Sequence, residues 1–233
     1  MEIITNESLV RRNARIGQIS SIVGLLVLAG GMYISFTQAQ LFGLSLAALL
    51  VGFALSQIGI YFGNRWSRRP RPDEILNQAL KGLDDRYHLY HYETPASHLL
   101  VGPAGIWVLL PRHQRGTITY DEDKKRWRQK GGNLYLKIFA QEGLGRPDLE
   151  IESETNAARS LLDKFLPEGE LPEVQAALVF TNDQVDVQAD NAPNPTLHVK
   201  KFKDFIRKEA KNKPISMDVV KEVQEELIEE TTS

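Results

Sequence analysis

The chain has 233 residues, of which 42% are apolar and 25% are charged, and it contains no cysteine. This length is enough for one or two domains with a sizeable core. The lack of cysteine excludes a disulfide framework, a thiol nucleophile, a CxxC redox site, an iron–sulfur cluster and a thiolate zinc site. The net charge of −2 removes the simplest argument for a general nucleic-acid binder.

Two uncharged stretches near the N-terminus are long enough to cross a membrane. Residues 16–36 and 41–62 contain no Asp, Glu, Lys or Arg, and at about 1.5 Å per residue each spans a hydrocarbon core of roughly 30 Å. Residues 37–40 between them predict a tight connection and hence a helical hairpin. A second full-length span argues against a cleaved signal peptide, and the lack of a polar stripe argues against a buried soluble hairpin.

The flanks of this hairpin are basic, which indicates its orientation. By the positive-inside bias both flanks, and both termini, are expected in the cytoplasm, as in a two-pass protein of the cytoplasmic (inner) membrane. Neither span contains an ionisable residue, so the hairpin is interpreted as a plain lipid anchor rather than a transport path. The flanking basic residues are Arg11, Arg12 and Arg15 before the first span and Arg65, Arg68, Arg69 and Arg71 after the second.

The rest of the chain predicts a mixed domain of strands and helices. Four of the 28 basic and two of the 30 acidic residues precede residue 67, so the remainder carries a net charge of −4. Its order of elements indicates an α/β (α+β) fold with a central mixed sheet flanked by helices. Strands are expected over 87–92, 98–101, 105–110, 117–120, 126–129, 172–180 and 197–199, and helices over 73–83, 150–166, around 202–206 and over 217–230.

Most familiar catalytic patterns are missing. The five histidines show no HxxxH or HExxH spacing on a predicted helix, and His88 and His91 fall on opposite faces of one strand. The turn at 102–105 lacks the Gly-Lys-Ser/Thr ending of a phosphate-binding loop, and no GxGxxG sequence opens a helix. We therefore expect neither a metal centre nor a nucleotide-phosphate loop.

A basic cluster surrounds Trp127 in the hairpin predicted over 117–129. Such a cluster can bind a phosphate backbone weakly, or it can protect the edge of a sheet from pairing with another strand. The acidic helix at 217–230 is either a solvated terminal helix or a helix that docks on a partner. The residues considered for nucleic-acid binding are Arg112, Arg115, Lys124, Lys125, Arg126, Arg128 and Lys130.

The segment from Ser97 to Ile118, SHLLVGPAGIWVLLPRHQRGTI, resembles the nuclease-related domain (NERD) family. In that family a strand, a Val-Gly-Pro-x-Gly turn and a second strand precede a Lys/Arg-Gly step. The likeness continues through the helix with Glu74, the Arg-x-Leu-Leu helix at 159–162 and the ALVFTN strand at 177–182, and it covers about residues 73–210. It implies a restriction-endonuclease-like fold and descent from metal-dependent DNA-cleaving domains.

The resemblance also implies where a catalytic site would lie. Such nucleases use two carboxylates to hold Mg²⁺ and a lysine to orient or activate water. The family pattern places these groups at Ser97, Leu110 and Arg112, so both acids and the lysine are replaced. Leucine cannot ligate a cation, and arginine, with a pKa above about 12, is a poor base. Mg²⁺ is expected only if acids have relocated, as Glu74 or residues 121–123 would allow.

These features predict a membrane-anchored, catalytically inactive nuclease-related domain that binds or scaffolds at the cytoplasmic membrane face. Its expected partners are the lipid bilayer, a protein and, weakly, nucleic acid. Two alternatives are a divergent metal-dependent nuclease with relocated carboxylates, and a hairpin that serves a membrane complex with the soluble part as its docking platform. The expected parts are an N-terminal segment 1–15, spans 16–36 and 41–62, a basic linker 63–72, a NERD-like domain 73–210 and an acidic helix 211–233.

Overall fold

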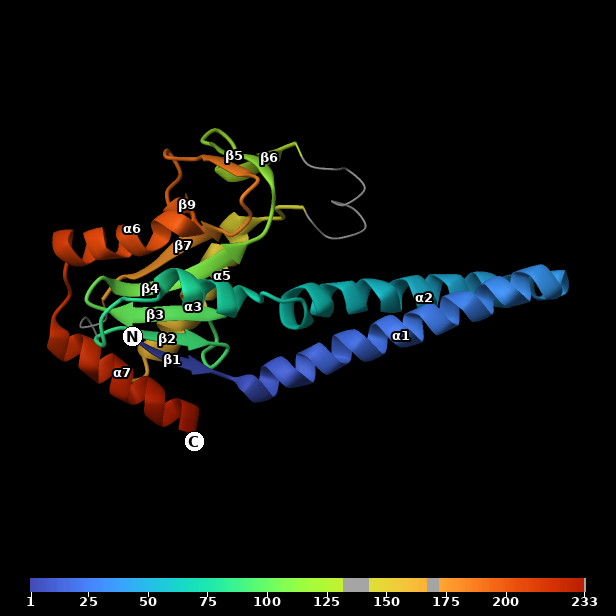
Figure 1. The fold of residues 1–233 in the computed structure, drawn as a ribbon, viewed down its shortest axis with the longest axis horizontal. Coiled ribbons are helices and arrows are strands. Elements are labelled where there is room, and N and C mark those ends of the chain that lie inside the picture. The colour runs from blue at the N-terminus through green and yellow to red at the C-terminus, as the bar shows by residue number, and fades with distance from the viewer. Residues whose placement is uncertain (132–142, 167–171, 233) are drawn as a thin grey trace. The chain divides into compact units, whose positions relative to one another are not determined.

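The structure is a computed structural model, and it describes residues 1–131, 143–166 and 172–232 (Figure 1). These residues form two compact units. The helical unit is residues 7–71, and the sheet unit is residues 1–6 together with the described residues from 72 onward. Between the strand expected at 126–129 and the helix expected at 150–166 the sequence predicts no regular element, and residues 132–142 of this stretch lie outside the described residues.

The helical unit is an antiparallel pair of long helices, α1 (Glu7–Thr37) and α2 (Phe42–Phe62), joined by a short turn at Ala39–Leu41 (Figure 1). Both helices are long and apolar enough to cross a membrane. Only 11% of the apolar window of each is buried within the protein, whereas the core helix of a soluble protein is mostly buried. The expected hairpin of two apolar spans is therefore present.

Small residues let the two helices approach closely. A Cβ atom added at Gly24 would lie 2.9 Å from the backbone nitrogen of Ser56, so the contact has no room for a larger side chain. The hydroxyl of Ser45 donates a hydrogen bond of 2.8 Å to the carbonyl oxygen of Gly31 across the pair. The small buried residues recur every seven positions: Gly17, Gly24 and Gly31 on α1, and Ser45, Gly52 and Gly59 on α2.

The sheet unit is built on a six-stranded mixed sheet in the order β1-β2-β3-β4-β7-β9. Strands β2, β3 and β4 form an antiparallel meander, and β4, β7 and β9 run parallel to one another. This confirms the mixed sheet and the turn expected at 102–105. The strands are β1 (Glu2–Thr5), β2 (His88–His91), β3 (His98–Gly102), β4 (Gly105–Arg112), β7 (Val174–Phe180) and β9 (Thr196–His198).

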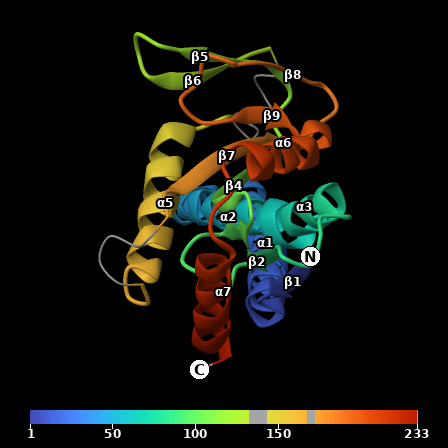
Figure 2. The same cartoon turned by 90° about the vertical axis from the view of Figure 1, so that its left-hand side faces the viewer.

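Helices cover both faces of this sheet (Figure 2). On one face α5 (Pro147–Leu162) and α7 (Met217–Thr232) bury their apolar residues with those of β3 and β4. On the other face α3 (Pro72–Leu80) and α6 (Val199–Asn212) do the same. The central strands are buried on both sides, which explains their nearly continuous apolar sequences. The fold class is α+β, as expected.

A second sheet of three strands lies beside the first, in the order β6-β5-β8 (Figure 2). It consists of β5 (Gly116–Asp121), β6 (Arg126–Lys130) and β8 (Val185–Gln188). The hairpin of β5 and β6 was predicted, but β8 was not, because four residues with two apolar positions give little signal. Ile118 and Trp127 of this sheet are buried in the core beneath α5.

The first residues of the chain form a strand rather than a simple flanking segment. Strand β1 pairs in parallel with β2, with Glu2 opposite His88 and Thr5 opposite His91. Residues 1–6 therefore belong to the sheet unit, whereas the sequence had placed 1–15 in one N-terminal segment. The strand was missed because its partner lies more than 80 residues away along the chain.

Helix α7 is part of the core and not a separate tail. Val220, Val223 and Leu227 are almost fully buried, and they join the cluster formed by β3, β4 and α5. Ser216 caps the helix, its hydroxyl accepting a bond of 3.3 Å from the amide of Asp218. The apolar face of α7 therefore packs against the protein's own core. The expectation that this face would be solvated or would dock on a partner is wrong.

Candidate functional site

The positions implied by the family pattern meet under helix α5. Ser97 directly precedes β3, while Leu110 and Arg112 lie at the end of β4. Leu110 packs into the core with Ala158 and Leu161 of α5. Ser97 and Arg112 each contact a carboxylate of the same helix. The structure therefore brings the three positions to one face of the sheet.

Two glutamates of α5 bind the polar side chains at these positions. Glu154 accepts hydrogen bonds from the hydroxyl of Ser97 at 2.8 Å and from its backbone amide at 3.0 Å. Glu150 accepts a charge-assisted bond of 2.5 Å from Nη2 of Arg112. The two glutamates are one helical turn apart, so they share a face of the helix. Neither glutamate was predicted as a site residue. Their i, i+4 spacing on an amphipathic helix was the one signal that could have indicated them.

Arg112 provides a positive charge beside Glu150, at the place where a metal ion would otherwise bind. The side chain of Arg112 is only 14% exposed, and its guanidinium neutralises the charge of Glu150. A metal ion would have to displace this fixed positive charge before it could use that carboxylate. Among the residues that the structure describes, no group of three or more His, Asp or Glu side chains is placed to hold a metal ion.

The acids considered for relocation lie elsewhere. Glu74 is on α3, which packs against the opposite face of the sheet from α5. Asp121 forms an ion pair of 2.7 Å with Arg128 within its own hairpin, and Glu122 accepts a bond of 2.7 Å from Asn191. None of these described contacts brings a second acid to Arg112.

The basic hairpin is defined by Lys124, Lys125, Arg126, Arg128 and Lys130, of which the three lysines are exposed and the two arginines are half-buried. Trp127 is only 4% exposed, and its indole nitrogen donates to the hydroxyl of Thr196 at 3.0 Å. Single-stranded nucleic acids are bound by stacking their bases on exposed aromatic rings, and the buried ring of Trp127 cannot serve in this way. Arg115 lies beside the hairpin, and Nη1 is 3.5 Å from the side-chain oxygen of Gln184. The exposed lysines of the basic hairpin form an edge that is suited to backbone phosphates.

A histidine pair is buried on the other face of the sheet. His91 and His98 are opposite each other in the ladder of β2 and β3, and their Nδ1 atoms are 2.8 Å apart. Nε2 of His91 is 2.9 Å from the side-chain oxygen of Asn77 on α3. His88 lies on the opposite face, near the hydroxyl of Tyr90 and the carboxylate of Glu2. The expectation that His88 and His91 point apart is confirmed.

Comparison with known proteins found no match to a family model, to a curated protein or to a solved structure. What the structure itself defines is a class of architecture: a pair of helices of membrane-spanning length joined to an α+β unit with a mixed sheet.

Proposed function

We propose that the chain is a membrane-anchored nuclease-related module without catalytic activity, which binds or scaffolds at the cytoplasmic face of the inner membrane. The observation that carries the proposal is the pair formed by Arg112 and Glu150. Arg112 stands where the family resemblance places the lysine, and its guanidinium neutralises Glu150, a carboxylate that reaches this position from α5.

The order of elements supports the relationship to nuclease-related domains. Helix α3, the meander of β2, β3 and β4, the crossover helix α5 and the parallel strand β7 follow one another as the resemblance implies. Fold alone does not carry activity, so the argument depends on the site. There Ser97 and Leu110 replace the two acids, and the hydroxyl of Ser97 is already bonded to Glu154.

The pairing of β1 with β2 supports the proposed membrane topology. These strands precede and follow the hairpin in the chain, and they are neighbours in one sheet. A single sheet folds on one side of a bilayer, which supports a topology with both ends of the hairpin on that side. The basic residues at both ends favour the cytoplasm as that side. The lipid bilayer is then one partner of the protein, and a protein is the expected second.

The alternative, a divergent metal-dependent nuclease, would have to use Glu150 and Glu154. They lie on one face of α5 beside the expected site. Glu150 is neutralised by Arg112, however, and Glu154 is occupied by Ser97. Two such occupied carboxylates make a poor site for Mg²⁺, which prefers several oxygen ligands in octahedral geometry.

A cleavage assay separates the two functions. The full chain in detergent micelles is incubated with supercoiled plasmid and Mg²⁺ or Mn²⁺, with EDTA as the control. The full chain is needed because a fragment that starts after the hairpin would lack β1. We expect no metal-dependent nicking. Nicking that EDTA abolishes and that Glu150→Gln removes, while the exposed Glu152→Gln retains it, would establish the nuclease instead.

A gel-shift titration with the same protein tests weak nucleic-acid binding. Binding through the basic hairpin would fall steeply with salt and would be lost when Arg126 and Lys130 are replaced by alanine. Binding that persists in this variant would place the contact elsewhere. No binding at low salt would leave protein and lipid as the partners of the module.

A further inference from the structure

A pocket of about 540 Å³ lies between the loop that follows α3, the end of α6 and the start of α7, all within the sheet unit. This volume is in the range of small-molecule sites, about 300 to 1,000 Å³. Its charged lining residues are Asp84, Arg86, Arg207 and Lys211. We call it the basic pocket, because three cations face one anion there although the part of the chain after residue 67 is acidic as a whole.

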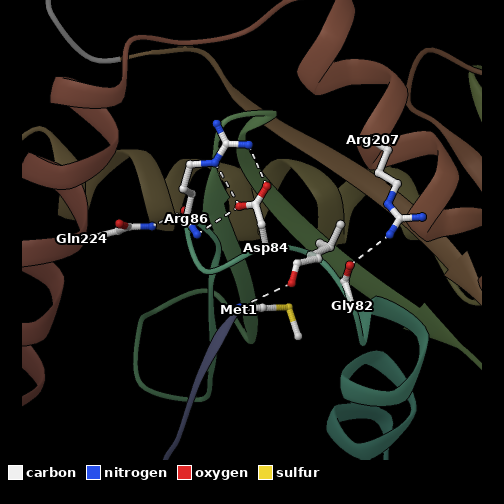
Figure 3. A network of polar contacts seen from close by, with 7 residues as sticks. Met1, Gly82, Asp84, Arg86, Arg207 and Gln224 are labelled. Carbon is white, nitrogen blue, oxygen red and sulfur yellow. Dashed lines mark hydrogen bonds and ion pairs between the residues drawn. The ribbon is translucent and has the colours of Figure 1, made fainter.

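The one acid of the basic pocket is already saturated. Both carboxylate oxygens of Asp84 accept bonds from Arg86: Oδ1 from Nε and from the backbone amide at 3.1 Å each, and Oδ2 from Nη2 at 2.7 Å (Figure 3). These bonds hold the pKa of Asp84 below its usual value. Among the described residues Nη1 of Arg86 has no hydrogen-bond partner, so one edge of this guanidinium can still bind an anion.

The other two cations come from the last turns of α6. Arg207 donates from Nη2 to the carbonyl oxygen of Gly82 at 3.0 Å, which fixes its side chain at the wall of the basic pocket (Figure 3). Lys211 is exposed, and no acid among the described residues pairs with it. The four charged lining residues, three cations and one acid, sum to +2, which matches the charge of a phosphomonoester, about −1.5 to −2. Nη1 of Arg207 also lies 3.8 Å from the carboxylate of Asp204, which does not line the basic pocket.

The walls of the basic pocket are held in place before any ligand arrives. Gln224 of α7 donates from Nε2 to the carbonyl oxygen of Arg86 at 3.0 Å (Figure 3). The amide of Ile215 donates to the carbonyl oxygen of Pro103 at 3.3 Å, which ties the linker between α6 and α7 to the turn of β3 and β4. Such preorganisation lowers the cost of binding.

The uncharged lining includes Gly82, Tyr87 and Ala210, and an apolar part that comes from Leu83, Pro103, Pro214, Ile215 and Met217. A free phosphate would leave this part of the basic pocket unused, whereas a ring attached to the phosphate would cover it. We propose that the basic pocket binds a nucleoside monophosphate, with Arg86, Arg207 and Lys211 contacting the phosphate and Pro103, Pro214 and Met217 contacting the ring. This site is separate from the positions under α5.

Calorimetric titration of the full chain in detergent with adenosine 5′-monophosphate tests the proposal. Adenosine tests the need for the anion, inorganic phosphate tests the need for the ring, and glycerol 3-phosphate represents a lipid headgroup. We expect the monophosphate to bind at least tenfold more tightly than each of the three. No binding at millimolar monophosphate would overturn the proposal, as would a comparator that binds equally well.

Two matched charge reversals on α6 locate the site. Lys211→Glu places a carboxylate in the basic pocket, and we expect it to weaken monophosphate binding at least tenfold. Lys208→Glu is the control, because Lys208 is exposed on the same helix and does not line the basic pocket. An equal effect of the two reversals, or no effect of Lys211→Glu, would contradict the assignment. A thermal unfolding midpoint measured for each variant without ligand establishes that both remain folded.

Discussion

The Nδ1 atoms of His91 and His98 lie 2.8 Å apart in the core, where the two side chains are 0% and 2% exposed. At this distance one ring nitrogen must carry the proton and the other must accept it. Nε2 of His91 faces the side-chain oxygen of Asn77 at 2.9 Å and donates to it. In the neutral pair Nδ1 of His91 is therefore the acceptor and Nδ1 of His98 the donor.

Replacing one member of this pair should cost more than replacing both. His98→Leu leaves the acceptor on His91 buried without its donor, which costs about 1 to 3 kcal/mol. The double variant His91→Leu with His98→Leu removes donor and acceptor together, so its loss should be smaller than the sum of the single losses. Denaturant unfolding of the full chain measures all three, with the exposed His113→Leu as control. Strictly additive losses would show that the two rings do not interact.

His88 should make the sheet unit less stable in mild acid. Burial lowers the pKa of His88 below 6.5, against the opposing effect of the nearby Glu2 carboxylate. The folded state therefore favours the neutral ring, so its contribution is complete above about pH 6.5 and falls as the pH drops below that value. Thermal midpoints between pH 7.5 and 5.5 should fall more for the native chain than for His88→Gln. Parallel pH profiles for the two would refute this role, and His113→Gln serves as the exposed control.

The sequence predicted those elements whose signal is local. The strands at 98–101 and 105–110 were found because an apolar run, a Gly-Pro turn and a second apolar run follow one another. The helix at 150–166 was found from its apolar spacing, although it begins at Pro147. Strand β1 and strand β8 were missed because four-residue strands gain their stability from distant partners. Likewise, nothing local indicated that α7 would be buried against β3.

The neighbours of the three positions taken from the family resemblance were not evident from the sequence. The resemblance named Ser97, Leu110 and Arg112, and the structure brings these residues together under α5. Which side chains of α5 face these three positions depends on the angle and rotation of α5 over the strands. Core packing sets this rotation, and the local sequence does not. The basic pocket could not be predicted from the sequence either, because its lining comes from segments more than 120 residues apart.

Strand β1 gives a matched pair of proline variants. The amides of Glu2 and Asn6 donate to carbonyl oxygens at the β2 side, so the amide of Ile4 faces the same way and that of Ile3 faces the open edge. Ile4→Pro removes a ladder bond and should lower stability by about 1 to 3 kcal/mol, while Ile3→Pro should cost much less. Hydrogen exchange of residues 88–91 reports the difference. Equal exchange in both variants would argue against the parallel pairing.

The Arg112 and Glu150 pair should be worth little in free energy despite its geometry. Half of the Glu150 side chain is exposed, so water and salt weaken the attraction. A double-mutant cycle with Arg112→Met and Glu150→Ala should give a coupling of about 1 kcal/mol or less, smaller still in 1 M salt. Denaturant midpoints measure it, and a coupling that is insensitive to salt would mean that the pair is shielded from water.

The small-residue contact between α1 and α2 can be tested on two glycines of one helix. Gly24→Val would place its Cβ 2.9 Å from the backbone nitrogen of Ser56 and must push the helices apart, whereas a Cβ at Gly30 meets nothing within 4 Å. Because the chain has no cysteine, a pair introduced across the helices can report their separation by cross-linking. We expect Gly24→Val to abolish the cross-link and Gly30→Val to preserve it. A cross-link retained by both variants would mean that the helices do not pack through this stripe.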